Sequence, residues 1–160
     1  LEVEVTLPML ERLALDGSGD TRINGFSGER IELSLSGSGS VQFNGRYRQA
    51  RAVLHGSGDL SVDAGNSDSI EAELMGSGTL SLAGATRRFK YEGSGTGTLD
   101  AQRLRTEEAQ LRQSGSGDAS ITVRDTVNAA VSGSGDIDVH GAPSQRNVSR
   151  SGSGTVHFVE

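Results

Sequence analysis

Apolar and polar side chains alternate along most of this chain with a period of two residues. Residues 137–140 show the pattern, because Ile137 and Val139 are apolar whereas Asp138 and His140 are polar. Period-two alternation is typical of β-strands that bury one face. Helical spacing fits none of the repeated stretches, so the sequence predicts an all-β chain.

The alternating stretches are arranged around a Gly-Ser-Gly triplet that occurs eight times. Successive triplets are 17 to 22 residues apart, with a mean spacing near 19 residues. The triplets begin at Gly17, Gly37, Gly56, Gly76, Gly93, Gly115, Gly133 and Gly152. When these glycines are aligned, the position six residues later is apolar in every copy: Ile23, Phe43, Val62, Leu82, Leu99, Ile121, Val139 and Phe158. A repeat this regular predicts one structural unit per copy.

A unit of about 19 residues cannot bury its own apolar face, whereas stacked units can bury one another's. The glycines of each triplet fall on inward positions and the serine on an outward one, which predicts a tight corner between strands. We therefore predict an all-β, single-domain parallel β-helix (β-solenoid) over residues 1–160, with about eight coils of roughly 19 residues. The predicted hand is right-handed, because parallel crossover connections nearly always are. Segments 25–29, 45–49 and 141–145 are expected to be loops.

Both ends of the sequence continue the strand pattern. Leu1, Val3 and Val5 alternate like the last strand of a preceding coil, so we expect the chain to lack one or more N-terminal flanking coils. At the other end, residues 155–159 alternate in the same way and no polar cap follows them. Uncapped solenoid ends expose unpaired strand edges. The sequence therefore predicts that this chain can form oligomers through the ends of the solenoid.

The composition of the chain excludes several classes of protein. The chain contains no Cys and no Trp, which excludes a disulfide framework and a core built on large aromatic residues. The formal net charge of −6 argues against nucleic acid as a partner, because phosphate binding needs a positive surface. No apolar run is long enough to form a transmembrane segment. We also expect no cofactor.

The repeated motif resembles that of a known family. Residues 131–141 read Val-Ser-Gly-Ser-Gly-Asp-Ile-Asp-Val-His-Gly, and residues 7–10, Leu-Pro-Met-Leu, precede the first triplet with its Asp20. This pattern resembles the "putative auto-transporter adhesin, head GIN domain" family, from about Val3 to the end of the chain. The resemblance implies a β-helix domain of an exported bacterial envelope protein, in the periplasm, the outer membrane or the cell surface. It implies no catalytic residues.

Carboxylates and imidazoles come together at one place in the repeat. In the stacked register Asp118 lies beside Asp136, and Asp138 lies beside His157, with His140 further along the same strand. A transition-metal ion accepts such ligands. A second interpretation is a calcium ion bound to the Asp that follows the triplet. The alternative is an exposed polar strand with one surface pair. We assign no metal site and keep these five residues as candidates.

Arginine supplies all but one of the fifteen basic residues, the exception being Lys90. A group of these arginines in the back segments would form a basic strip for carboxylate, sulfate or phosphate groups: Arg46, Arg48, Arg51, Arg87 and Arg88. The alternative is ordinary solvated loop charge interleaved with glutamate.

The spacing of the polar residues shows no nucleophile–base pair and no converging pair of carboxylates, so we expect no catalytic residues. We predict a non-catalytic exported cell-envelope domain, an adhesin or binding module whose extended surface binds a glycan or an envelope or matrix protein. The alternative is a structural spacer or oligomerising scaffold. A polysaccharide-active β-helix enzyme is the third hypothesis, after the binding module and the scaffold.

Overall fold

The computed structural model describes residues 2–4 and 12–159, in which every regular element is a β-strand. The strands are β1 (Glu2–Glu4), β2 (Arg12–Gly17), β3 (Asp20–Gly37), β4 (Ser40–Gly56), β5 (Asp59–Gly76), β6 (Thr79–Gly93), β7 (Thr98–Gln113), β8 (Ala119–Val131), β9 (Ile137–His140), β10 (Gln145–Arg150) and β11 (Val156–Val159). Leu1 and Val5 of the expected N-terminal coil lie outside the described residues, whereas Val3 in β1 pairs with Thr21 of β3.

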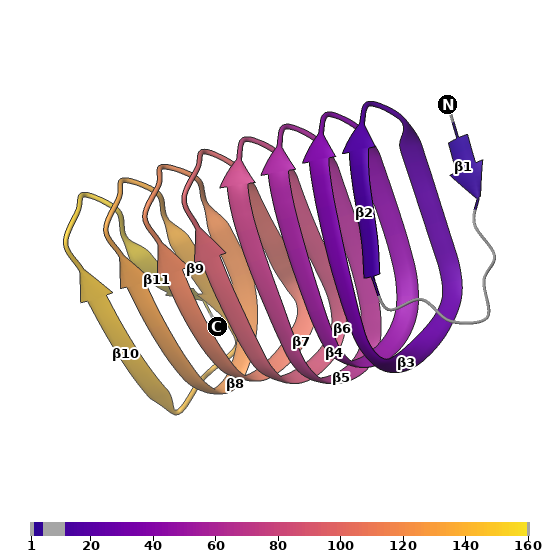
Figure 1. The fold of residues 1–160 in the computed structure, drawn as a ribbon. Coiled ribbons are helices and arrows are strands. Elements are labelled where there is room, and N and C mark those ends of the chain that lie inside the picture. The colour runs from indigo at the N-terminus through magenta and orange to yellow at the C-terminus, as the bar shows by residue number, and fades with distance from the viewer. Residues whose placement is uncertain (1, 5–11, 160) are drawn as a thin grey trace.

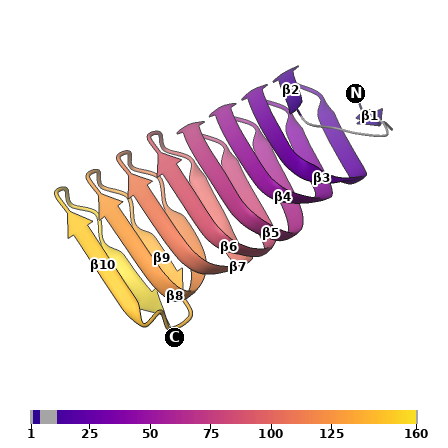
Figure 2. The same cartoon turned by 60° about the horizontal axis from the view of Figure 1, so that its bottom comes forward.

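Each strand pairs in parallel with the equivalent part of a neighbouring turn. The strand order is β1-β3-β4-β5-β6-β7-β8-β9-β11, with β2 beside β3 and β10 beside β8. Figures 1 and 2 show the result as one stack of similar turns, with β1 and β10 at opposite ends. The predicted parallel β-solenoid is confirmed, with about eight turns of about 19 residues.

Equivalent inward residues of successive turns stack into apolar columns. Ile23 pairs with Phe43, which in turn pairs with Val62 of the following turn. The buried apolar residues form one cluster that runs from Ile23 to Val139. Burying a side chain of this size contributes roughly 1.5–3 kcal/mol relative to leaving it exposed. Contacts between turns therefore stabilise a domain whose single turns have no core of their own.

The corners between strands are built on one backbone carbonyl per turn. The carbonyl of Gly37 accepts hydrogen bonds from the N–H groups of Ser57 (3.1 Å) and Gly58 (3.1 Å) in the next turn. The same double contact recurs at Gly17, Gly56, Gly76 and Gly95. A Cβ on Gly58 would overlap the carbonyl oxygen of Gly39 in the preceding turn, so the backbones stack too closely for a side chain. The predicted outward serines are confirmed, and the second glycine is buried at every corner from Gly39 onward. The first glycine of each corner is exposed or half-buried, so the prediction that both glycines point inward is wrong for it.

The fifth corner is not the fifth Gly-Ser-Gly triplet. The carbonyl of Gly76 accepts hydrogen bonds from Thr96 (3.0 Å) and Gly97 (2.9 Å), so the corner is Gly95-Thr96-Gly97. The alignment on Gly93 is therefore wrong by two residues. The sequence of residues 93–97 contains two overlapping triplets, and only the hydrogen bonds to the preceding turn distinguish them.

This shift makes the repeat more regular. Counted from Gly95, successive corners are 18 to 20 residues apart along the whole chain. Leu99 pairs with Leu80, and Ala101 takes the column position that pairs with Ile121 in the next turn. The fifth turn thus contributes Ala101, not Leu99, to the column that includes Phe43.

The displaced Gly93 leaves a niche in the core. Gly93 pairs with Leu74 on one side and with Gln113 on the other. A Cβ on Gly93 would overlap both the hydroxyl oxygen of Tyr91 and Oε1 of Gln113, so these two side chains occupy the niche. Gln113 Nε2 donates a hydrogen bond to the carbonyl of Gly117 at 2.6 Å. The Tyr91 hydroxyl and Gln113 Oε1 are buried without a hydrogen-bond partner, and burial raises the pKa of the Tyr91 phenol above its ordinary value.

Two of the three segments expected to be loops are parts of strands. Residues 25–29 lie within β3 and residues 45–49 within β4, and differences in length appear as shifts of register, such as the one between Asn44 and Gln49. The loop prediction is wrong here because a strand inside the stack has neighbours on both sides that can satisfy its backbone groups. Residues 141–144 do form a loop, and Gln145 begins β10.

Candidate functional site

A groove of about 700 Å³ runs across the outer surface of the turns from β5 to β9, and we call it the basic groove. It is lined by Asn66 and Ser67 from β5, Ala85, Thr86 and Arg87 from β6, Arg105, Thr106 and Glu107 from β7, Thr122, Val123 and Arg124 from β8, and Gly141 and Ala142 from the loop after β9. Neighbouring turns are about 4.8 Å apart, so five contributing turns give a length of roughly 19 Å.

Small residues form the floor of the basic groove. Ser67 pairs with Thr86, Thr86 pairs with Thr106, and all three are buried. Ser67 Oγ donates a hydrogen bond to the carbonyl of Tyr47 (2.6 Å), and Thr86 Oγ1 donates one to the carbonyl of Arg88 (3.0 Å). The hydroxyls of Ser67 and Thr86 are thus engaged by backbone carbonyls, and the lining of the groove is more apolar than polar.

A glycine lies at one end of the groove, where two turns approach closely. Gly141 has a φ of 95°, a conformation that favours glycine. A Cβ at this position would overlap the carbonyl oxygen of Val123 in the preceding turn. The neighbouring Ala142 is exposed and adds only a methyl group to the lining.

Positive charge surrounds the floor. Arg87, Arg105 and Arg124 come from three successive turns, and Glu107 is the only carboxylate among the lining residues. Arg87 and Arg105 are exposed, and neither takes part in an ion pair within the described part of the chain. Arg124 Nε lies 3.9 Å from Asp125 Oδ1. The groove therefore offers at least two uncommitted guanidinium groups in a chain whose formal net charge is −6.

The arginines of the predicted basic strip make several different contacts in the structure. Three of its arginines face glutamates of neighbouring turns: Arg48 and Glu29 (3.7 Å), Arg51 and Glu73 (3.4 Å), and Arg88 and Glu108 (3.9 Å). The aliphatic part of Arg46 lies beside Gly65, and Arg87 lines the basic groove. Arg105 and Arg124 were not among the arginines predicted from the sequence. Their spacing was a partial signal, because these residues follow Arg87 at steps of 18 and 19 residues, but in register Arg105 pairs with Ala85 and Thr122 and not with another arginine.

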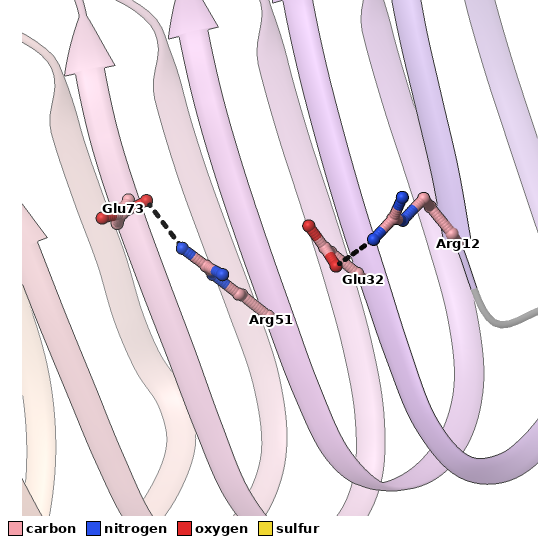
Figure 3. Close-up of polar contacts among 4 residues, drawn as sticks. All are labelled: Arg12, Glu32, Arg51 and Glu73. Carbon is pink, nitrogen blue, oxygen red and sulfur yellow. Dashed lines mark hydrogen bonds and ion pairs between the residues drawn. The ribbon is translucent and has the colours of Figure 1, made fainter.

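Opposite charges alternate on another outward column. Arg12 pairs in register with Glu32, and Glu32 pairs with Arg51 of the following turn. The next residue of the column is Glu71. Figure 3 shows one contact within this column, with Arg12 Nη2 3.3 Å from Glu32 Oε2, and one that leaves it, with Arg51 Nη2 3.4 Å from Oε2 of Glu73, two residues beyond Glu71. Facing opposite charges favour this pairing register, a role that the sequence analysis did not assign to these residues.

Three aspartates that follow corners, Asp59, Asp118 and Asp136, bind the backbone of the next turn. Asp118 Oδ1 accepts a hydrogen bond from the N–H of Asp136 (3.0 Å). Asp136 Oδ1 in turn accepts hydrogen bonds from the hydroxyl (2.8 Å) and the N–H (3.0 Å) of Thr155. The hydroxyl of Thr155 first, then its backbone N–H and the nearby His157, lower the pKa of the Asp136 carboxyl.

The candidate metal ligands lie at the corners and first strands of the last three turns: Asp118, Asp136, Asp138, His140 and His157. Asp138 pairs with His157, as the stacked register predicts. His157 Nε2 lies 2.8 Å from the hydroxyl of Thr155, which also binds Asp136. Among the described residues, no three His, Asp or Glu side chains are grouped closely enough to hold a metal ion.

A second, polar hollow of about 480 Å³ lies over the turns from β4 to β7. Its polar lining consists of Gln42, Asn44, Ser61, Asp63, Ser81, Asp100 and Arg103. Asp63 accepts a hydrogen bond from the N–H of Gly65 (3.2 Å), and Asp100 accepts one from the N–H of Gln102 (3.4 Å). Each carboxylate therefore stabilises the backbone two residues further along its own strand.

Comparison with known proteins places this architecture among bacterial domains. A putative lipid binding protein from Parabacteroides distasonis ATCC 8503 has 26% sequence identity and a TM-score of 0.90, with 94% of this chain and 62% of that chain covered. A putative adhesin from Bacteroides fragilis NCTC 9343 has 22% identity and a TM-score of 0.69, with 94% and 61% covered. This chain thus spans about three fifths of the length of either structure. No curated protein matches it.

The part of the chain that the structure describes contains no helix long and apolar enough to cross a membrane. The sequence profile of one family matches residues 1–143, which is most of the chain and includes seven of the eight triplets. The resemblance drawn from the repeated motif is confirmed by this match. The chain belongs to the family described as "Putative auto-transporter adhesin, head GIN domain".

Proposed function

We propose that this chain is an exported, non-catalytic binding domain of the cell envelope and that the basic groove is its ligand site. The observation that carries the proposal is the gathering of Arg87, Arg105 and Arg124 around a groove in an acidic domain. Guanidinium groups bind carboxylate, sulfate and phosphate groups through paired hydrogen bonds. The partner is therefore a ligand with acidic groups, carried by a glycan, a matrix or envelope protein, or a lipid.

The family and its solved relatives support a binding role. The family description names an adhesin, and the structure with 26% identity is described as a lipid binding protein. Neither description names an enzyme. An adhesin acts at the cell surface, which supports export of this domain.

The polar contacts also support a non-catalytic role. The carboxylates of the polar hollow bind their own backbone, and the basic groove has Glu107 as its one carboxylate. The hydroxyls of Ser67 and Thr86 donate to backbone carbonyls, so no adjacent base activates them.

The test is an array of acidic glycans, matrix proteins and anionic lipids, probed with the purified chain. The decisive variant is Arg87→Glu with Arg105→Glu, and its control is Arg30→Glu with Arg112→Glu, which changes the net charge equally outside the groove. We expect binding to an acidic ligand that the groove variant loses and the control variant retains. Equal loss in both variants, or no acidic ligand bound by the unaltered chain, would overturn the proposal.

A structural spacer or oligomerising scaffold is the second candidate. Val148 and Val159, on the last turns of the stack, are 41% and 42% exposed. Light scattering during size-exclusion chromatography tests this alternative. A dimer that Val148→Glu converts to a monomer would favour it, and a monomer at all concentrations would count against it.

A further inference from the structure

We infer that the ligand of the basic groove is a single-chain anionic amphiphile, with its acidic head at the arginines and its hydrocarbon chain along the floor. The inference rests on the proposed function, because it names the ligand class of the same groove. Two features of the groove carry it: an apolar floor and a local excess of uncommitted guanidinium groups.

The floor suits a hydrocarbon chain. The side chains of the half-buried Ala85 and the exposed Ala142 present carbon, and the hydroxyl of Thr86 is occupied by the carbonyl of Arg88. The hydroxyl of Thr122 likewise donates to the carbonyl of Gln102 at 2.8 Å. Contact between such a surface and an alkyl chain removes apolar area from water, which is the main favourable term for a hydrocarbon ligand.

The arginines suit one compact acidic head. Arg87 and Arg105 belong to adjacent turns, and Arg124 to the turn after them. Turns are about 4.8 Å apart, and Arg105 pairs with Ala85, two residues before Arg87, so the long side chains of Arg87 and Arg105 can reach a single carboxylate or phosphate between them. The groove continues past the arginines in both directions, to Asn66 on one side and to Ala142 on the other. A hydrocarbon chain of roughly 19 Å or less therefore fits within the length of the groove.

The same features count against an acidic polysaccharide. None of the residues that line the groove is aromatic, so no ring is present to stack on a sugar face. The engaged hydroxyls of Ser67, Thr86 and Thr122 leave few donors for sugar hydroxyl groups. A repeating polyanion would also need basic residues along its whole length, whereas these arginines occupy the middle turns.

Isothermal titration of the whole chain with monomeric laurate, below its micelle concentration, tests the inference. Two further probes separate the contributions of the hydrocarbon chain and of the negative charge. Dodecyl maltoside has a hydrocarbon chain without a charge, and chondroitin sulfate has negative charge without a hydrocarbon chain. Arg105→Gln is the groove variant, and Arg112→Gln on the same strand is its matched control. Ala142→Trp fills the groove without changing its charge. Circular dichroism spectra and thermal midpoints establish that each variant is folded.

We expect saturable binding of laurate that Arg105→Gln and Ala142→Trp each weaken at least about tenfold and that Arg112→Gln leaves unchanged. Dodecyl maltoside should bind at least about tenfold more weakly than laurate. Binding of chondroitin sulfate at the groove without binding of laurate would overturn the inference and leave the proposed function standing. Laurate binding that neither groove variant changes would also overturn it, because the site would lie elsewhere. Failure of every acidic probe would overturn both.

Discussion

The hydroxyl of Tyr91 and the side-chain carbonyl of Gln113 lie against the same bare backbone, at Gly93, and neither has a hydrogen-bond partner. Both side chains are buried in the core of the solenoid. An unpaired buried polar atom costs about 1–3 kcal/mol of desolvation that no hydrogen bond returns. Among the described turns, the fourth and fifth, which carry these two side chains, therefore hold the buried side-chain polar atoms that lack a partner.

Tyr91→Phe removes one of these unpaired atoms and keeps the ring in place. We expect the variant to unfold at an unchanged or higher temperature, with a gain in the free energy of unfolding of up to about 1 kcal/mol. Thermal unfolding followed by circular dichroism measures the effect. A fall of several degrees would show that the hydroxyl has a partner in solution.

The niche at Gly93 also predicts coupling between two positions. Tyr91 and Gly93 occupy the column positions that Ala72 and Leu74 fill in the preceding turn. Tyr91→Ala alone should open a cavity, and Gly93→Leu alone should collide with Tyr91 and Gln113. The double variant restores the pattern of the preceding turn, so its loss of stability should be smaller than the sum of the two single losses by about 1–3 kcal/mol. Additive losses in a double-mutant cycle would contradict the assigned register.

Close stacking at the corners makes a methyl group costly there. Gly58→Ala would place a Cβ against the carbonyl oxygen of Gly39, and the backbone of the preceding turn would have to move. We expect a loss of about 3 kcal/mol, or roughly 6–12 °C in the thermal midpoint. Ser57→Ala changes the adjacent exposed residue and should stay within about 0.5 kcal/mol of the unaltered chain. Equal midpoints for the two variants would argue against the close approach.

The hydrogen bonds to Asp136 predict a dependence of stability on pH. The pKa of this carboxyl is lowered in the folded chain, so the unfolded chain takes up the proton more readily. The stabilisation is present above the ordinary carboxyl pKa of 3.8 and is lost as the pH falls through the lower folded value. The thermal midpoints of the unaltered chain and of Asp136→Asn should therefore converge below about pH 4. A difference between them that stays constant from pH 7 to pH 2 would refute this assignment.

The alternating charges predict a salt-sensitive effect. Arg51→Glu would place a carboxylate between those of Glu32 and Glu71 and remove the partner of Glu73. We expect a loss of about 1 kcal/mol at low ionic strength that shrinks in 1 M NaCl, because salt screens exposed charges. Arg51→Gln is the control, since it removes the charge without adding repulsion. Equal losses for the two variants would mean that repulsion between turns is negligible.

The fold could be predicted from the sequence because the signal was repeated. One turn with alternating residues would be ambiguous, whereas eight glycine corners define the stack and its parallel direction. The error at Gly93 arose because residues 93–97 satisfy the corner pattern in two registers. Contacts to the neighbouring turn decide between the registers, and those contacts lie about 19 residues away in the sequence.

The candidate site was harder to predict than the fold. Arg87, Arg105 and Arg124 are one turn apart, but register shifts between β6, β7 and β8 decide which outward residues share a groove. The predicted strip grouped arginines by their segment, and several of these face glutamates of adjacent turns instead. A surface site depends on side-chain partners that a one-dimensional pattern does not contain.

The hydrogen bonds between successive corners have a consequence for how such a domain changes in size. The N–H of Ser38 already lies 3.0 Å from the carbonyl oxygen of Gly17, on the turn beneath it. Excision of residues 18–37 would bring these two residues together in sequence as well as in space, and the strands on either side would find partners of the same pattern. A single insertion or deletion in the gene can thus add or remove a whole turn. The solenoid can lengthen or shorten in this way while the groove over β5 to β9 is left as it is.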